Sequence, residues 1–136
     1  MSRSFPYRRR QSPLFGQVLR PLVDFEIRSK VLDEWTTVEN ALADTGADAS
    51  LIPSSIGSVL VEDITSGPRT DVGGVVPGAR LPAYLHSFTY RLGKRVFEAP
   101  TFIADVEECP VLLGRMGALD RWRATYAHGR VLRIRK

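Results

Sequence analysis

Residues 41–53 read Ala-Leu-Ala-Asp-Thr-Gly-Ala-Asp-Ala-Ser-Leu-Ile-Pro and carry the most specific pattern in this chain. Asp44 follows an apolar segment, precedes Thr45 and Gly46, and is followed by a second apolar segment. A glycine permits a tight loop, and its backbone N–H can hydrogen-bond a carboxylate. The Thr45 hydroxyl can donate and accept, so it can lock the loop to a neighbouring chain. The stretch therefore predicts one carboxyl group presented on a stiff turn with apolar walls.

Two later segments are also informative. Residues 71–78 read Asp-Val-Gly-Gly-Val-Val-Pro-Gly, which taken alone indicates a glycine-rich turn. Residues 111–115 read Val-Leu-Leu-Gly-Arg, and the short apolar run predicts a fully buried strand. Residues 115–122 then form the one helix that the sequence predicts, and Gly117 keeps that helix short.

Most of the chain beyond residue 20 shows the period-two alternation of β-strands. Residues 23–28 alternate apolar with charged side chains, and residues 35–42 are rich in β-branched ones. Residues 81–92 and 96–104 predict the two strands of a hairpin. Short strands with frequent glycine and proline predict an all-β barrel or sandwich. The sequence has no internal repeat.

Composition predicts one folded domain with a basic arm. The 136 residues are 43% hydrophobic, which is enough to bury a single core, so we expect one globular domain over residues 21–136. Residues 1–20 contain five arginines and no acidic residue, and they lack a sustained hydrophobic period. We expect these residues to form a basic, flexible N-terminal arm.

Cysteine content and hydropathy exclude several classes of protein. Cys109 is the only cysteine, so an intrachain disulfide and a metal site built from several thiolates are excluded. A catalytic thiol stays open, but a small buried hydrophobe is the commoner role of such a residue. No run approaches the roughly 18 apolar residues of a membrane helix, so no membrane span is expected. The cytoplasm is the expected compartment, because a reducing environment fits this cysteine usage.

Residues 41–53 closely resemble the active-site signature of the retropepsin-like aspartic proteases, in which Asp-Thr-Gly-Ala precedes an acidic residue and a Ser or Thr. Residues 111–115 resemble the second signature of that family, and residues 71–78 occupy the place of its glycine-rich flap. The resemblance implies a closed all-β barrel with a flap hairpin and one short C-terminal helix. It also implies an aspartic endopeptidase that acts on peptide or protein substrates and needs no cofactor and no metal.

The chemistry of peptide hydrolysis requires a second carboxyl group. One carboxylate cannot be both the base that activates water and the acid that protonates the leaving amine. Because the chain has one such motif and no repeat, we expect a homodimer in which each copy contributes Asp44 as its catalytic residue. The two carboxyl groups would share one proton, so one activates water while the other donates to the peptide carbonyl oxygen.

The resemblance implies further roles for residues near Asp44. Thr45 would bond its symmetry mate beneath the two carboxyl groups, and Gly46 would contact bound substrate or the carboxyl pair through its backbone. Asp48 would pair with Arg115, which links the signature loop to the predicted helix. The residues expected to support the active-site loop are Thr45, Gly46, Ala47, Asp48, Gly114 and Arg115, and those expected to bind substrate from the flap are Gly73, Gly74, Val75, Val76 and Gly78.

Two other functions stay open at this point. A catalytically inactive protein of the same fold could use its cleft only to bind peptides. Alternatively, residues 1–20 could contact nucleic acid, in which case binding would weaken steeply with salt. Peptide hydrolysis is the leading prediction and nucleic acid is not an expected partner, because a carboxylate motif is far more specific than a run of charge.

Overall fold

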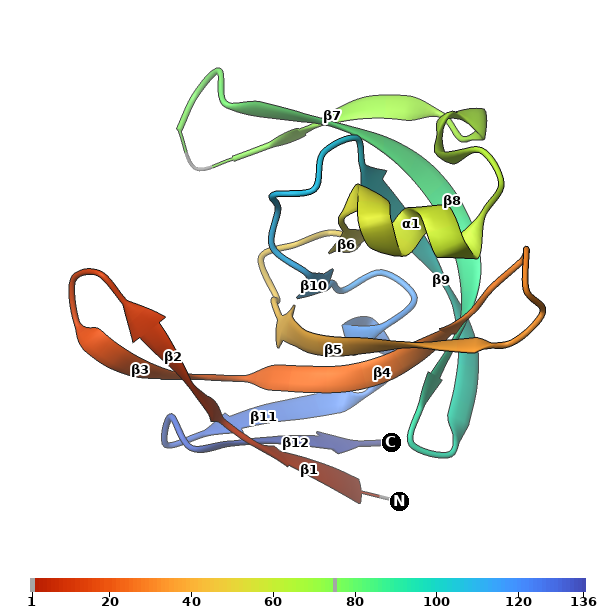
Figure 1. Ribbon diagram of the computed structural model, residues 1–136. Coiled ribbons are helices and arrows are strands. Elements are labelled where there is room, and N and C mark those ends of the chain that lie inside the picture. The colour runs from red at the N-terminus through yellow and green to blue at the C-terminus, as the bar shows by residue number, and fades with distance from the viewer. Residues whose placement is uncertain (1, 75) are drawn as a thin grey trace.

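The computed structural model describes residues 2–74 and 76–136, so Val75, one of the predicted flap residues, lies outside the described residues (Figure 1). The strands are β1 (Ser2–Pro6), β2 (Arg8–Ser12), β3 (Gly16–Arg20), β4 (Leu22–Arg28), β5 (Trp35–Ala43), β6 (Ser50–Ile52), β7 (Arg69–Gly73), β8 (Arg80–Leu92), β9 (Arg95–Ala104), β10 (Leu112–Leu113), β11 (Arg123–Ala127) and β12 (Val131–Arg135). The helices are α1 (Ser54–Leu60) and two 3-10 turns, η1 (Ile64–Ser66) and η2 (Leu119–Arg121).

Within the described residues, a ring of six strands forms a closed barrel. In order around the ring these are β4, β5, β10, β6, β9 and β8. The ring closes because β8 pairs back onto β4, with Tyr90 opposite Ile27 and Arg91 opposite Glu26. β7 pairs antiparallel with β8 outside the ring. The predicted all-β barrel is therefore confirmed.

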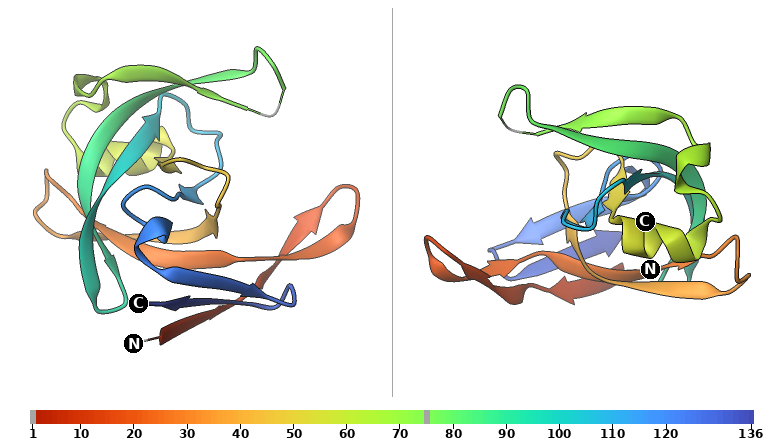
Figure 2. Two further views of the ribbon diagram at one scale, coloured as in Figure 1. Left: turned by 180° about the vertical axis from the view of Figure 1, so that it is seen from behind. Right: turned by 45° about the horizontal axis from the view of Figure 1, so that its top comes forward.

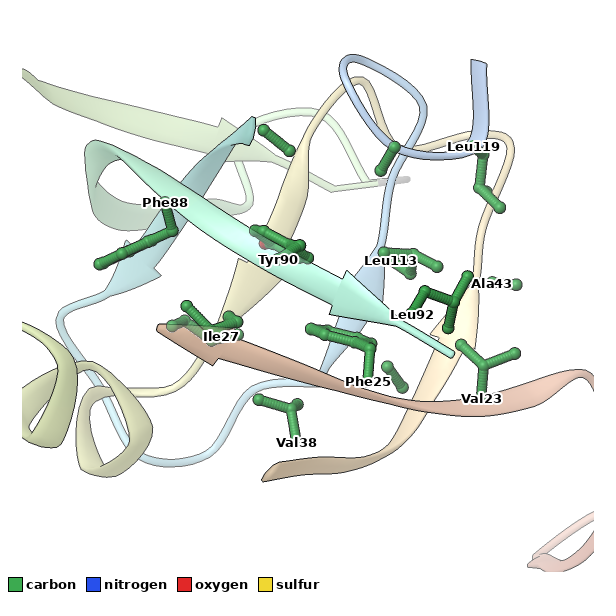
Figure 3. Close-up of a cluster of buried hydrophobic side chains, with 14 of the residues drawn as sticks. Val23, Phe25, Ile27, Val38, Ala43, Phe88, Tyr90, Leu92, Leu113 and Leu119 are labelled. Atoms are coloured by element: carbon green, nitrogen blue, oxygen red, sulfur yellow. The ribbon is translucent and has the colours of Figure 1, made fainter. Parts of the chain in front are cut away.

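Alternating side chains fill the interior of the barrel. Along β4 the residues Val23, Phe25 and Ile27 point into the core and are at most 3% exposed, as the period-two pattern predicts. The Tyr90 ring stacks on Phe25, with centroids 5.2 Å apart (Figure 3), and on Phe97, with centroids 5.4 Å apart. This packing joins β4, β8 and β9 and so holds the wall of the barrel together.

Residues 2–20 differ from the expected flexible arm, because they form strands. β1 pairs antiparallel with β12, and β12 pairs with β11, so the two ends of the chain lie in one three-stranded sheet. Phe5 on β1 is 7% exposed and belongs to the hydrophobic core. β2 and β3 pair only with each other. The partner that orders β1 is more than a hundred residues away in sequence, which is why composition alone pointed to disorder.

The helices also differ in part from the prediction. The short helix near the C-terminus is present as η2, a single 3-10 turn, because Gly117 has a φ of +70° and interrupts any helix over residues 115–122. α1 was not predicted. It packs on β9 through Gly57, where a side chain would collide with Ile103. In the part of the chain that the structure describes, no helix has the length and apolar character needed to cross a membrane.

Candidate active site

Asp44 lies where the chain leaves β5 beside β10. The two strands run parallel, with Leu42 opposite Leu112 and Ala43 opposite Leu113. The Asp44 N–H continues this ladder by donating to the Leu113 carbonyl oxygen at 3.0 Å. Both predicted signatures therefore meet at Asp44, and the half-buried Asp44 side chain starts from a strand end that the sheet holds in place.

The loop after Asp44 turns back onto its carboxyl group. The Gly46 N–H donates to Asp44 Oδ1 at 2.8 Å, and the Ala47 N–H donates to the Asp44 carbonyl oxygen at 3.2 Å. A Cβ at Gly46 would lie 3.1 Å from Asp44 Oδ1, so the absence of a side chain allows this approach. The turn thus presents one carboxylate in a defined orientation, with the Thr45 side chain exposed beside it.

Residues 114–116 lie against the outgoing half of the same loop. The Arg115 N–H donates to the Ala47 carbonyl at 3.0 Å, and the Met116 N–H donates to the Asp48 carbonyl at 2.8 Å. The expected ion pair is present, with Arg115 Nη2 donating to Asp48 Oδ1 at 2.8 Å. Because the Asp48 side chain is 76% exposed, this pair contributes little stability and mainly orients the two segments. Gly114 allows the approach, since a side chain there would collide with the backbone of Ala49.

Buried hydroxyl groups lie next to the contact between residues 114–116 and the Asp44 loop. The Gly114 N–H donates to the Ser50 hydroxyl at 3.0 Å, and the hydroxyls of Tyr90 and Thr101 hydrogen-bond each other. Burial raises the pKa of the Tyr90 phenol to about 12, although the nearby hydroxyls of Thr101 and Ser50 oppose part of that rise. These contacts connect the barrel wall to the segment that carries Gly114.

A cleft of about 890 Å³ separates the Asp44 loop from the β7–β8 hairpin, which crosses above the loop between β5 and β6 (Figure 1). The lining combines small and apolar side chains with carboxylates. Its residues are Leu42, Asp44, Gly46, Ala47, Asp48, Ala49, Leu51, Thr70, Asp71, Val72, Gly73, Gly74, Phe102, Pro110 and Leu112. The volume falls in the range of ligand-binding sites, so the cleft can accommodate a segment of another molecule beside Asp44.

Comparison with solved structures determines the fold. The chain is similar to a retropepsin-like aspartic protease from Rickettsia conorii, with a TM-score of 0.63 and 15% identity over 98% of this chain and 91% of that chain. The chain has a retropepsin-like fold. An EIAV protease complexed with the inhibitor HBY-793 is a further match, with a TM-score of 0.49 and 23% identity over 76% of this chain and 86% of that chain. No protein-family model matches the chain, and no curated protein matches its sequence.

In this retropepsin-like fold the predicted flap segment is the end of the β7–β8 hairpin. The Gly74 N–H donates to the Ala79 carbonyl at 3.2 Å, and Gly78 has a φ of +86°, which favours glycine. Gly73 and Gly74 line the cleft, whereas Val76 and Gly78 lie in the exposed turn outside the described lining. The structure therefore brings part of the predicted flap set to the site.

Sequence patterns missed some residues at the site. Phe102 lines the cleft. A sequence signal for this exists: on β9 it alternates with Thr101 and Ile103, which face the core, so Phe102 faces away from the core. Tyr126 on β11 donates to the Ala43 carbonyl at 3.2 Å. Burial, followed by the charges of Tyr7 and Asp44, raises the pKa of Tyr126. No local sequence pattern marks Tyr126, because its contact joins residues far apart in the chain.

Proposed function

We propose that this protein is an aspartic endopeptidase whose catalytic pair consists of Asp44 from two copies of the chain. The observation that carries the proposal is the Asp44 carboxylate, held by the Gly46 N–H at 2.8 Å on the wall of a cleft of about 890 Å³. The retropepsin-like fold supports the proposal but does not carry it, because one fold can serve several functions.

The ion pairs around the cleft support Asp44 as the reacting carboxylate. Three carboxylates line it, those of Asp44, Asp48 and Asp71. Asp48 pairs with Arg115 at 2.8 Å, and Asp71 pairs with Arg69 at 3.6 Å. Among the described residues of the lining, Asp44 is the carboxylate without an ion pair. Asp44 is thus the carboxylate of the lining that its own loop holds and that no described ion pair engages, and the proposal takes the acid and the base of the reaction from two copies of it.

The proposed mechanism follows from placing two such groups together. Carboxyl groups within hydrogen-bonding reach cannot both ionise easily, so they share one proton. The ionised Asp44 accepts a proton from a water molecule that attacks the peptide carbonyl carbon. The protonated Asp44 of the other copy donates to the carbonyl oxygen, and a proton then passes to the departing amine. Thr45, exposed beside Asp44, would bond its symmetry mate and hold the two loops together.

The shape of the cleft favours an extended peptide as substrate. β7 is an edge strand, and residues 70–74 line the cleft, so a peptide could add to it by strand pairing. In this arrangement the β7–β8 hairpin acts as the flap. Leu51, Phe102 and Leu112 provide apolar surface for substrate side chains. Ala47, Asp48, Gly114 and Arg115 position the Asp44 loop rather than touch the reacting atoms.

The test compares the wild type with Asp44→Asn, which keeps the shape of the side chain but removes its acid–base chemistry. Each protein is incubated with a diverse peptide mixture from mildly acidic to neutral pH, and cleavage sites are mapped by mass spectrometry. The matched control is Asp33→Asn, a change in the β4–β5 turn at a φ of +52° that asparagine also tolerates. We expect cleavage by the wild type and the control, and a loss of roughly a thousandfold or more in Asp44→Asn.

Two results would contradict the proposal. Cleavage that persists in Asp44→Asn would mean that Asp44 is not catalytic or that a contaminant is responsible. Peptide binding without cleavage by a dimeric wild type would instead favour the catalytically inactive peptide-binding function.

A further inference from the structure

The hairpin formed by β2 and β3 stands apart from the barrel. In the part of the chain that the structure describes, its two strands form a separate two-stranded sheet, from Arg8 opposite Arg20 to Ser12 opposite Gly16. It projects past the loop between β5 and β6, on the side where the tip of the β7–β8 hairpin also lies (Figures 1 and 2). Leu14 and Phe15 at its tip are 81% and 73% exposed. An isolated two-stranded hairpin is marginally stable in water, so this one needs a surface to pack against.

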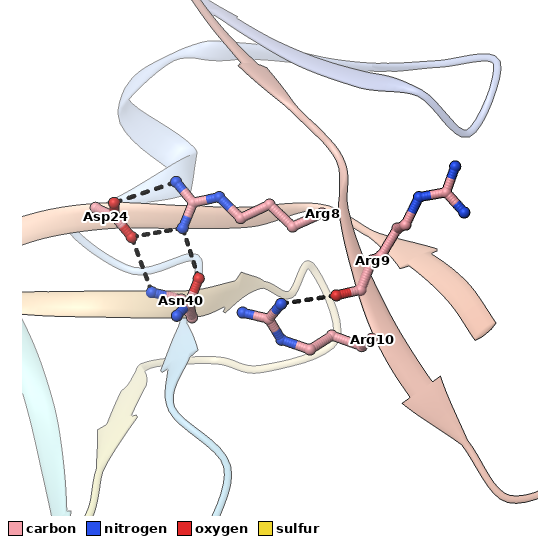
Figure 4. A network of polar contacts seen from close by, with 5 residues as sticks. All are labelled: Arg8, Arg9, Arg10, Asp24 and Asn40. Carbon is pink, nitrogen blue, oxygen red and sulfur yellow. Dashed lines mark hydrogen bonds and ion pairs between the residues drawn. The ribbon is translucent and has the colours of Figure 1, made fainter. Parts of the chain in front are cut away.

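Side-chain hydrogen bonds join the base of the hairpin to the barrel. Arg8 donates to both oxygens of Asp24, at 2.7 and 3.1 Å, and to Asn40 Oδ1 at 2.6 Å (Figure 4). Asp24 also accepts from the Asn40 N–H at 2.9 Å, where Asn40 has a φ of +57° in a bulge of the β4–β5 ladder. The bidentate contact between Arg8 and Asp24, at the bulge that contains Asn40, fixes the direction in which the hairpin leaves the barrel. The hairpin therefore projects as an oriented arm.

The arm begins beside the catalytic loop. The Pro21 carbonyl accepts from the Ala43 N–H at 3.0 Å, and Leu22 lies opposite Leu42. A five-residue strand extends about 17 Å. The two Asp44 carboxyl groups of an active dimer must approach to about 3 Å. In such a dimer, an arm that starts next to Asp44 and projects past its loop would cross the two-fold axis and reach the other copy.

The charges of the two surfaces are complementary. Residues 8–20 contain four arginines and no acidic residue. Among the described ion pairs, the arginine of this arm that takes part is Arg8, which leaves Arg9, Arg10 and Arg20 available. The described lining of the cleft contains three aspartates and neither lysine nor arginine. Asp48 and Asp71 pair with Arg115 and Arg69, so the carboxylate that the cleft side of a second copy offers to the basic arm without a described ion pair is Asp44.

We propose that the β2–β3 hairpin is a dimerisation arm that packs against a second copy of this chain, buries Leu14 and Phe15 there, and holds the two Asp44 loops together. The inference rests on the proposed function in one respect, because the need to bring two Asp44 groups together places the two-fold axis beside the base of the arm. It assigns to residues 8–20 a role in completing the catalytic site.

The experiment separates dimerisation from catalysis. Sedimentation measures the dimer dissociation constant in an Asp44→Asn background, where self-cleavage cannot interfere, with and without the double change Leu14→Ser and Phe15→Ser. The matched control changes Leu32 and Val96 to serine, because both are exposed, at 55% and 58%. Leu32 lies between β4 and β5, and Val96 lies on β9 next to its turn with β8; both connections are on the side away from the β2–β3 hairpin (Figure 1). We expect the arm variant to raise the dissociation constant roughly tenfold or more and the control to leave it unchanged.

Further measurements on fold, protection and activity make the result decisive. Circular dichroism and thermal melting check that the arm variant retains the fold. Hydrogen exchange is followed for residues 12–19 as the Asp44→Asn protein is concentrated, and we expect their protection to rise as dimer forms. With Asp44 intact, the arm variant should cleave peptide slowly when dilute and recover at high protein concentration.

The outcomes distinguish this inference from the proposed function. The dimerisation role of the arm is wrong if the folded arm variant keeps the dissociation constant unchanged, or if residues 12–19 gain no protection with concentration. This holds even if the wild type cleaves peptide. A dimer that depends on the arm but never cleaves peptide supports the dimerisation role of the arm and contradicts the proposed endopeptidase function. A wild type that stays monomeric at every concentration overturns both.

Discussion

The buried phenol of Tyr90 makes the stability of this fold fall at alkaline pH by an amount that can be calculated. Burial raises its pKa from 10.0 to about 12. Each pH unit of difference between folded and unfolded states is equivalent to about 1.4 kcal/mol, so the full difference is worth about 2.7 kcal/mol. Because the folded pKa lies above the unfolded one, this stability is present below pH 10 and is lost as pH rises through the folded pKa. About half of it, 1.4 kcal/mol, is lost by about pH 11.

The assay is urea denaturation of the wild type and Tyr90→Phe at several pH values between about 8 and 11. At the lower end Tyr90→Phe should be less stable by about 1 kcal/mol, because its hydrogen bond with Thr101 is lost. The difference should then shrink and change sign near about pH 11, because the variant no longer carries a phenol that resists ionisation. Groups that titrate in both proteins cancel in this comparison.

Phe88→Leu is the control, because Phe88 is a buried aromatic residue of the same strand without an ionisable group. It should lower stability at every pH without changing the slope. If the difference between the wild type and Tyr90→Phe stays constant across this range, Tyr90 ionises as easily in the folded state as in the unfolded chain. The reasoning from burial would then be wrong.

Two other predictions concern the supports of the site. Arg8→Ala should lower the free energy of unfolding by less than about 1 kcal/mol at neutral pH, since Arg8 and Asp24 are partly exposed. Arg8 holds the pKa of Asp24 below its ordinary 3.8, so this contribution is lost as pH falls below that value. The free energies of unfolding of the wild type and Arg8→Ala, measured by urea denaturation, should therefore converge in acid. Gly114→Ala should lower the free energy of unfolding by about 2 kcal/mol and reduce peptide cleavage more than tenfold, because the alanine side chain would collide with the Ala49 backbone. Unchanged cleavage kinetics and an unchanged melting temperature would contradict this.

Local patterns in the sequence were sufficient for β4, β5, β8, β9 and β10 and for the Asp44 loop, whereas the short strand β6 (Ser50–Ile52) was marked only as an apolar segment. Period-two alternation marks β4, β8 and β9 because each presents one face to the core. Glycine and proline mark the turn between β7 and β8 because backbone conformation there depends on nearby residues. The Asp-Thr-Gly sequence indicates a carboxylate bound by its own loop, and the contact from Gly46 to Asp44 has that form. Each of these features involves residues close together in the chain.

The remaining features depend on residues far apart. β1 is ordered by β12, and the Arg8 side chain is held by Asp24 and Asn40. Neither partner can be read from residues 2–20, which by themselves have the composition of a disordered segment. Tyr126 meets Ala43 only because the C-terminal sheet packs beneath the Asp44 loop.

What the sequence determined by itself is the loop that presents the Asp44 carboxyl group and most of the strand pattern of the barrel, because both arise from neighbouring residues. What only the tertiary structure decided is which distant segments meet around the cleft, and where the basic hairpin projects. Those outcomes are set when distant segments pack together, since the energy of a charge or an exposed apolar side chain depends on what is brought against it.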